Sequence, residues 1–134
     1  MRTARLGKTG LEVSRVGMGG IPITRPSLDD ATKVIRRALD LGVNFIDTSL
    51  FYKDSEIRIG KGVEGRREEV ILATKGSWRE KAEALDCMER SLERLRTDYI
   101  DLWQFHNVSN YTIFFISIFL IRLTTISASP SSMY

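Results

Sequence analysis

The feature that most constrains this sequence is a series of short, mostly apolar runs, each followed at once by a polar or ionisable residue. The three clearest runs are 43–46, 70–74 and 99–105, and they lead to Asp47, Lys75 and His106. Runs of this kind are typical of buried strands in a parallel sheet. Ligands of parallel α/β proteins bind beyond the carboxyl ends of the strands, so these three residues are candidates for chemistry.

Helical patterns precede the first and the third of these runs. Apolar residues recur at helical spacing over 28–41 and again over 82–95. A Ser-x-x-Asp sequence at 27–30 and a Ser-x-x-Glu sequence at 77–80 predict capped starts for both helices. Gly42 is a typical residue to end the first of them.

The N-terminal part adds two further elements. The segments 2–6 and 11–16 predict a small β-hairpin, and 16–20 predicts a short strand that runs into a glycine-rich turn. Pro22 stands where the third glycine of a dinucleotide-binding fingerprint would fall, which favours an ordinary tight turn over a Rossmann loop. Strands therefore alternate with helices. Such βα repeats close most often as an eight-unit barrel or as an open doubly wound sheet.

Length and charge limit the classes of protein to consider. At 134 residues the chain is one domain or part of one. Its net charge of +3 comes from intermingled acidic and basic residues, so we expect no nucleic-acid partner. Cys87 is the only cysteine and is expected to be an inert core or boundary residue. The N-terminus lacks the apolar core of a signal peptide, so a cytoplasmic location is expected.

The last part of the chain has a different composition. Arg122 is the only charged residue after Asp101, and residues 110–134 are apolar or rich in serine and threonine, without helical or strand periodicity. A membrane anchor at 111–123 is one interpretation of this composition. The uncharged segment 113–121 has only nine residues, whereas a helix needs about 20 to span a bilayer, so no membrane insertion is expected.

Tyr52 lies one short loop beyond Asp47, so four polar groups are expected at one opening of the sheet. Each of them alone has an ordinary structural explanation, but their chemistry combines. A nearby ammonium favours the phenolate form of a tyrosine, so Lys75 would let Tyr52 exchange a proton near neutral pH. Asp47 would hold Lys75 in place, and His106 would hydrogen-bond a substrate oxygen beside the phenol. The set suits reversible protonation of a carbonyl oxygen.

Two other kinds of site are disfavoured by the sequence. One histidine and one distant cysteine give no pattern of metal ligands, so no metal is expected. The chain also has no Gly-x-Ser-x-Gly sequence to present a catalytic serine.

Several longer motifs occur in a fixed order along residues 1–109. They are Gly7-Lys8-Thr9-Gly10-Leu11-Glu12-Val13-Ser14, Asn44-Phe45-Ile46-Asp47-Thr48 through Tyr52, Ser55-Glu56, Ile59-Gly60, Ala73-Thr74-Lys75, and Asp98-Tyr99-Ile100-Asp101-Leu102 leading to His106. In this order they resemble the N-terminal half of the aldo-keto reductase family. The resemblance implies a (β/α)8 TIM barrel that uses NADPH to reduce small aldehydes or ketones to alcohols.

The resemblance also implies a role for each member of the site. Tyr52 would be the general acid, Lys75 and Asp47 would tune it, and His106 would orient the carbonyl for hydride attack. Asp47 is also expected to contact the cofactor. The opening of the chain leans towards the subgroup that carries iron-sulfur cysteines near its C-terminus, beyond the part of the family barrel that this sequence resembles.

The resemblance stops after Asn107. We expect an incomplete barrel over 1–109, built from an N-terminal hairpin and about four βα units, and a tail at 110–134 that is foreign to the family. Later units of the family barrel carry most of the cofactor contacts, so such a chain would be a truncated and inactive copy. The alternative is a non-catalytic binding or regulatory module, although the intact set of four residues favours an enzyme lineage.

An incomplete barrel would also expose surfaces that a closed one covers. The outer edges of the first and fourth parallel strands are expected to be unpaired. Phe45, Leu72 and Leu102 are expected to face the barrel interior and to lack half of their packing partners. Both features predict self-association.

Overall fold

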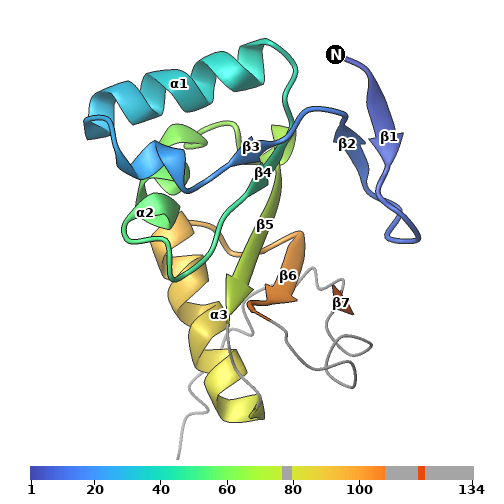
Figure 1. Cartoon of the computed structure of the whole chain (residues 1–134), viewed down its shortest axis with the longest axis vertical. Coiled ribbons are helices and arrows are strands. Elements are labelled where there is room, and N and C mark those ends of the chain that lie inside the picture. Colours follow the sequence, from blue (N-terminus) through green and yellow to red (C-terminus); the bar gives the residue numbers. More distant parts are fainter. Residues whose placement is uncertain (77–79, 108–117, 120–134) are drawn as a thin grey trace, which may run out of the picture.

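The computed structural model describes residues 1–76, 80–107 and 118–119 of the chain. They form an α/β structure in which a two-stranded sheet precedes a five-stranded sheet with helices along one face (Figure 1). The strands are β1 (Thr3–Arg5), β2 (Glu12–Ser14), β3 (Met18–Gly19), β4 (Phe45–Asp47), β5 (Ile71–Gly76), β6 (Leu102–Phe105) and β7 (Ile118–Phe119). The helices are α1 (Leu28–Asp40), α2 (Ser55–Gly62) and α3 (Lys81–Leu95), with short 3-10 helices at Pro22–Thr24 and Arg67–Glu69.

The predicted hairpin and the predicted parallel sheet are both present. β1 pairs with β2 antiparallel. β3, β4, β5 and β6 then follow one another in parallel, so that neighbours in the sheet are also neighbours in the chain. One of the helices α1, α2 and α3 lies in each connection between them. The prediction of a hairpin followed by βα units of a partial barrel is therefore confirmed.

The first long helix begins and ends where the sequence predicts. The Ser27 hydroxyl accepts a hydrogen bond from the Asp30 amide and donates one to the Asp30 carboxylate, which satisfies an amide that the helix itself cannot pair. Gly42 has a φ of +84°. This left-handed conformation lets the chain leave the helix at little cost only because glycine has no Cβ.

The buried faces of the helices are narrower than the sequence pattern predicts. The large apolar residues of the predicted stripes that lie more than a third exposed are Leu28, Val34, Leu41 and Leu85. The start of α3 also differs from the prediction. Glu80 is its N-cap residue and makes no side-chain hydrogen bond to the helix, while Ser77 lies outside the described residues. Cys87 is buried on this helix, as expected for a core residue.

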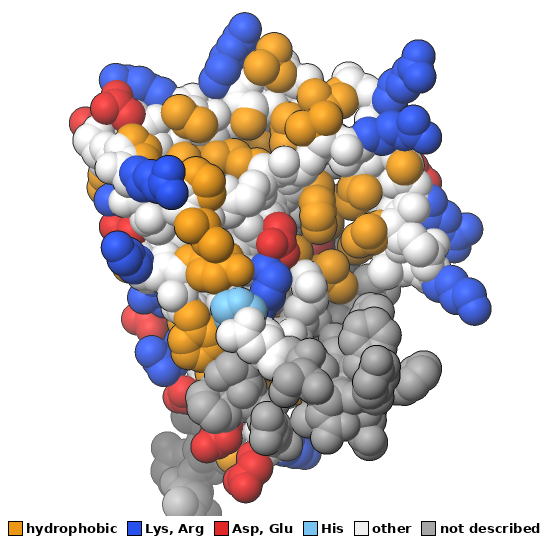
Figure 2. Space-filling view, in the orientation of Figure 1, with side chains coloured by type: hydrophobic (Ala, Val, Ile, Leu, Met, Phe, Trp, Pro, Cys, Tyr) orange, Lys and Arg blue, Asp and Glu red, His pale blue; other side chains and the backbone are white. Residues whose placement is uncertain are grey.

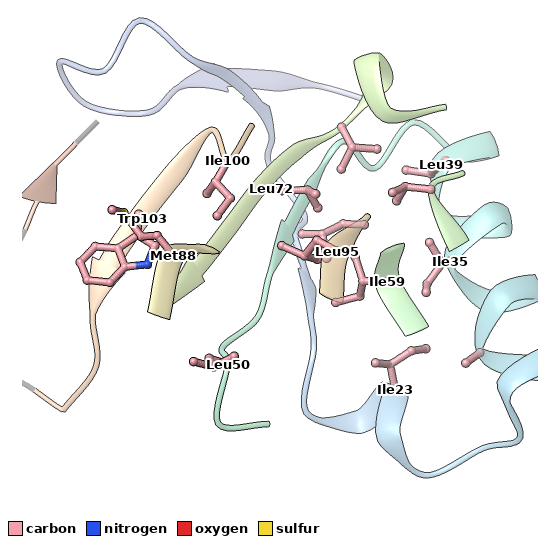
Figure 3. Packing of buried hydrophobic residues seen from close by; sticks show 14 of the residues in the cluster. Ile23, Ile35, Leu39, Leu50, Ile59, Leu72, Met88, Leu95, Ile100 and Trp103 are labelled. Atoms are coloured by element: carbon pink, nitrogen blue, oxygen red, sulfur yellow. The ribbon is translucent and has the colours of Figure 1, made fainter. Parts of the chain in front are cut away.

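The hydrophobic core lies between the parallel sheet and the helices (Figure 3). Ile46, Leu72 and Trp103 contribute to it from three neighbouring strands, together with Ile35 of α1 and Leu95 of α3. Side chains alternate between the two faces of a strand, so the residues on either side of Ile46 and Leu72 face away from the helices. The prediction that Leu72 faces the barrel interior is therefore wrong.

β7 also departs from the sequence-based expectation, which places no strand beyond residue 110 and leaves the outer edge of the fourth strand unpaired. β7 pairs antiparallel with β6, with Phe119 opposite Trp103 and Ile118 opposite Gln104. A strand of two residues is too short to show periodicity, so the sequence gives no signal for it.

None of the helices in the described part of the chain is both long enough and apolar enough to cross a bilayer. Most of the uncharged segment 113–121 lies outside that part.

Candidate active site

Asp47, Lys75 and Gln104 share one face of the sheet near the carboxyl ends of β4, β5 and β6. Asp47 lies opposite Ala73, and Lys75 lies opposite Gln104. Residues two apart on a strand point to the same face, so Ala73 and Lys75 both share the face of Asp47. This is the face turned away from Ile46 and the helices. The register therefore makes Asp47 and Lys75 diagonal neighbours.

Asp47 and Lys75 form an ion pair. Lys75 Nζ lies 2.6 Å from Asp47 Oδ2 and also donates a hydrogen bond of 2.8 Å to the Thr48 carbonyl. Gln104 Nε2 donates to the other carboxylate oxygen, Oδ1, at 3.4 Å. The Lys75 side chain is only 15% exposed, whereas that of Asp47 is 36% exposed. The ammonium is thus held in one place while part of the carboxylate still faces the opening.

Tyr52 is held by a compact turn between β4 and α2. Its amide donates to the Ser49 carbonyl at 3.0 Å, and its own carbonyl accepts from the Ser55 amide at 2.9 Å. Lys53, the next residue, has a φ of +49°, in the left-handed region. The turn brings the phenol ring to the site, where Lys75 Nζ lies 5.4 Å from the ring centroid.

His106 follows β6 directly and completes the group. Its amide donates to the Gly76 carbonyl at 2.6 Å, which extends the pairing with β5. Its Nε2 lies 3.5 Å from the Tyr52 hydroxyl oxygen, and the two rings meet edge to face with centroids 5.5 Å apart. Burial, and then the Lys75 ammonium, lower the pKa of His106 from 6.5, and Asp47 partly opposes them. The imidazole is therefore neutral at neutral pH.

The four residues that the sequence singles out thus lie together at one opening of the sheet. Figure 2 shows the chain's only histidine, in pale blue, beside a basic side chain, with an acidic one nearby and hydrophobic side chains around them. Phe51 contributes to this apolar surface. It is 48% exposed and stacks against the His106 ring, with centroids 6.0 Å apart and planes inclined by 23°.

Sequence reasoning missed two side chains at this site. Gln104 orients the Asp47 carboxylate, and the fully buried Ser49 hydroxyl lies 3.3 Å from His106 Nδ1. Strand alternation gives a signal for Gln104, since it lies two residues before His106 and so shares its face. No comparable signal exists for Ser49, because its contact depends on how the turn before Tyr52 folds.

A phenol beside a neutral imidazole can donate a proton to an oxygen atom placed next to it, and an ammonium near the phenol ring can stabilise the phenolate that remains. The apolar surface around them lowers the competition from water. Within the ranges that the structure describes, no group of three or more His, Cys, Asp or Glu side chains could hold a metal ion.

Comparisons with known proteins lead to one family. The sequence model of the Aldo/keto reductase family matches residues 15–124. L-galactose dehydrogenase from Arabidopsis thaliana is 40% identical over 118 residues, and the aldo-keto reductase YhdN from Bacillus subtilis is 38% identical over 125 residues. The two matches cover 77% and 79% of this chain but only 37% and 38% of the relatives.

Solved structures lead to the same family. An aldo-keto reductase from Klebsiella pneumoniae, solved in complex with NADPH, superposes with a TM-score of 0.73 at 29% sequence identity. The match covers 81% of this chain and 40% of that chain. The chain therefore spans about two fifths of the length of the proteins that it matches.

Proposed function

Because this chain belongs to the aldo/keto reductase family, we propose that it carries the proton-transfer site of an enzyme that reduces small aldehydes or ketones to alcohols with NADPH. One observation carries the proposal: the Tyr52 hydroxyl lies beside His106, next to a Lys75 ammonium that Asp47 holds at 2.6 Å. The ion pair is partly buried and lies on the face of the sheet opposite the core, beside the opening where a substrate would bind.

Each residue has a distinct part in the proposed reaction. When bound, NADPH supplies the hydride that is added to the carbonyl carbon. The Tyr52 hydroxyl gives its proton to the carbonyl oxygen, which yields the alcohol and leaves a phenolate. The Lys75 ammonium stabilises that negative charge, and Asp47 keeps the ammonium in place. His106 orients the reacting groups beside the phenol.

The described residues fit the part of an enzyme–NADPH complex in which the cofactor meets the substrate. Asp47 keeps part of its carboxylate exposed, at 36%, so it can accept a hydrogen bond from a hydroxyl or amide group of the cofactor. We assign the NADPH contact in the described part of the chain to Asp47. The remaining contacts would come from later βα units of a full barrel, so residues 1–134 alone are proposed to be inactive.

The boundary within the chain belongs to the same proposal. Residues 1–109 would supply the half of the barrel that carries the proton-transfer site, and residues 110–134 would be a tail from outside the family barrel. We propose a carbonyl compound as the substrate because its oxygen can accept the proton of the phenol while its carbon accepts the hydride.

The test uses a completed barrel, in which residues 1–107 of this chain are followed by the C-terminal half of the Klebsiella pneumoniae relative. Tyr52→Phe in this protein should lower turnover of aldehydes at least tenfold and leave NADPH affinity nearly unchanged, because the ring still fills its site. A variant that kept more than about a tenth of the turnover, a barrier change under about 1.4 kcal/mol, would refute the general-acid role.

Two controls make the result specific. Tyr99→Phe removes a hydroxyl at the other end of the sheet and should leave turnover close to that of the parent protein. A completed barrel that bound NADPH but reduced no aldehyde or ketone would favour a binding module over an enzyme.

A further inference from the structure

A chain of three side chains on the helix side of the sheet connects β5 to the turn that carries Tyr52. Thr74 Oγ1 donates a hydrogen bond of 2.7 Å to Glu56 Oε1, and Arg94 Nε donates one of 3.0 Å to Glu56 Oε2. Arg94 Nη2 donates in turn to the Lys53 carbonyl. The chain thus begins on a strand and ends on the backbone of the turn.

Both ends of this chain adjoin groups of the proposed proton transfer. Thr74 directly precedes Lys75 on β5, and Lys53 directly follows Tyr52. Side chains alternate along a strand, so Thr74 faces the helices while Lys75 faces the opening. Contacts on the helix side of the sheet therefore bear on where two groups lie on its other side.

Glu56 determines the direction in which Arg94 donates. Its carboxylate is fully buried, and the Arg94 side chain is 25% exposed. A guanidinium holds its five N–H groups in one rigid plane, so the pairing of Nε with Glu56 also fixes the direction of Nη2. The backbone of Arg94 is fixed as well. A Cβ at Gly60 of α2 would lie only 2.9 Å from the Arg94 carbonyl oxygen, so the two helices pack backbone to backbone.

The carbonyl that Arg94 holds belongs to a residue in an unfavourable backbone conformation. Lys53 has a φ of +49°, in the left-handed region that residues other than glycine rarely adopt. Such a conformation persists only where the surrounding structure holds it. The Ser55 amide holds the turn through its hydrogen bond to the Tyr52 carbonyl, and Arg94 holds it at the next residue.

We propose that Arg94 is a positioning residue that holds the turn between β4 and α2 and thereby places the Tyr52 hydroxyl. This inference rests on the proposed function and deepens it. Glu56 orients the guanidinium, which keeps Lys53 in the conformation that brings the phenol to its site. Arg94 acts from the helix side of the sheet, through the backbone of the turn.

The first measurement needs no activity, because His106 is the only histidine in the chain. The Tyr52 ring meets the imidazole edge to face, with centroids 5.5 Å apart, so the imidazole proton resonances report the position of the phenol ring. Arg94→Met in residues 1–134 removes the donor to the Lys53 carbonyl. Proton NMR of this variant should show shifted His106 resonances, because the turn relaxes and moves the phenol.

Arg67→Met is the matched control for a loss of stability alone. Arg67 also forms a partly buried ion pair, at 2.6 Å from Asp101, and both side chains are 15% exposed. This pair lies near the amino ends of β5 and β6, away from the site. Arg67→Met should weaken the fold in urea unfolding but leave the His106 resonances in place. Shifts in Arg94→Met no larger than those in the control would overturn the inference.

The same variants in the completed barrel separate turnover from binding. Arg94→Met should lower kcat at least about tenfold, because a misplacement of about 1 Å can cost about a hundredfold. NADPH affinity should stay nearly unchanged. Arg67→Met should keep a kcat close to that of the parent protein under conditions in which it is folded. A parent-like kcat in Arg94→Met would overturn the positioning role.

A double variant keeps the test decisive if Arg94→Met fails to fold. Glu56→Gln combined with Arg94→Met leaves no buried charge without a partner, yet it lacks the guanidinium that holds the turn. We expect the same shift of the His106 resonances and the same loss of kcat. Parent-like resonances or a parent-like kcat in the double variant would overturn the inference.

The two proposals fail in different ways. If the His106 resonances shift as expected but the completed barrel reduces no carbonyl compound, the proposed function is wrong, and Arg94 still holds the turn. If the barrel is active and Arg94→Met behaves as the parent protein does, the role of Arg94 is wrong and the proposed function stands.

Discussion

Lys75 Nζ and Asp47 Oδ2 are joined by a 2.6 Å ion pair across two neighbouring parallel strands, on the face of the sheet that is turned away from the helices. The pair holds a positive charge close to the Tyr52 ring, 5.4 Å from its centroid. A charge in this position stabilises the phenolate that forms when Tyr52 gives up its proton. The pair therefore matters to the proposed reaction more than to the core.

Replacing Lys75 by methionine in the completed barrel should lower kcat at least about a hundredfold, a typical loss when one group that stabilises developing charge is removed. The methionine keeps much of the side-chain volume but removes the charge. The measurement is steady-state reduction of an aldehyde at saturating NADPH. Lys33→Met is the control, since Lys33 is on the surface of α1 with its side chain 77% exposed. Equal losses in the two variants would contradict the proposed role of Lys75.

His106 should titrate below the ordinary histidine value of 6.5, because burial and the Lys75 ammonium both disfavour its charged form. Between the folded and unfolded pKa values the unfolded chain binds more protons, so the free energy of unfolding rises with pH in this window. The contribution of His106 to stability is present above 6.5 and is lost as the pH falls towards the folded-state pKa.

Proton NMR of this single histidine measures the titration midpoint directly. A midpoint at or above 6.5 would contradict the environment described for His106. Urea unfolding at pH 5.5 and 7.5 provides the second measurement: the increase in stability with pH should be smaller in His106→Gln than in the parent chain.

Glu56 is a buried carboxylate whose removal should destabilise the fold. It is fully buried, accepts from Thr74 Oγ1 at 2.7 Å and pairs with Arg94 Nε at 3.0 Å. It thereby joins α2, β5 and α3 on the helix side of the sheet. Burial raises the pKa of Glu56, and these hydrogen bonds partly oppose the shift.

Glu56→Ala should lower the free energy of unfolding by about 3 kcal/mol. This value is near the lower end of the range for removing one partner of a buried ion pair, because water can partly hydrate the Arg94 guanidinium once Glu56 is gone. Arg94 is 25% exposed. The measurement is urea unfolding followed by circular dichroism. Asp86→Ala breaks an exposed pair with Arg90 on α3 and should change stability much less. Similar losses in both variants would show that Glu56 is not a buried link between these elements.

The sequence predicts the elements and the group of four residues because both depend on local pattern. Apolar runs predict β4 and β5. The polar residue that follows each run lies at the carboxyl end of its strand, and ligands of parallel α/β proteins bind beyond these ends. The orientation of Leu72 could not be predicted in this way. A strand buried on both faces has no alternation of polar and apolar residues, so only the register with β4 shows which face Leu72 takes.

The contacts that sequence reasoning missed depend on parts of the chain that come together only in the fold. Ser49 meets His106 from a turn 57 residues away. β7 pairs with β6 through backbone groups, which every residue type except proline supplies in full. Neither contact leaves a periodic pattern of side chains in the sequence.

β7 should protect the sheet from self-association. It pairs with the outer edge of β6 at Trp103 and Gln104, and an unpaired edge is a template for another chain. Removing residues 110–134 should therefore increase the mass measured by light scattering at a given protein concentration. Removing only residues 120–134 leaves β7 in place and is the matched control. Equal masses for the two shortened chains would show that β7 does not protect this edge.

The polypeptide of residues 1–134 should neither bind NADPH tightly nor reduce carbonyl compounds. The described part of the chain provides four parallel strands, whereas the family barrel has eight. Within that part β3 pairs only with β4, so its other edge at Met18–Gly19 is open to a second copy. The proposed NADPH contact rests on Asp47 alone, and a proton donor without a positioned hydride donor gives no net reduction.

Fluorescence titration of residues 1–134 with NADPH, together with light scattering, tests this prediction. We expect no saturable binding at micromolar NADPH and a mass above that of one chain. The completed barrel is the positive control, since it contains the same site with a full set of strands. A monomer of residues 1–134 that bound NADPH at micromolar concentration and reduced an aldehyde would show that four parallel strands are enough for the reaction.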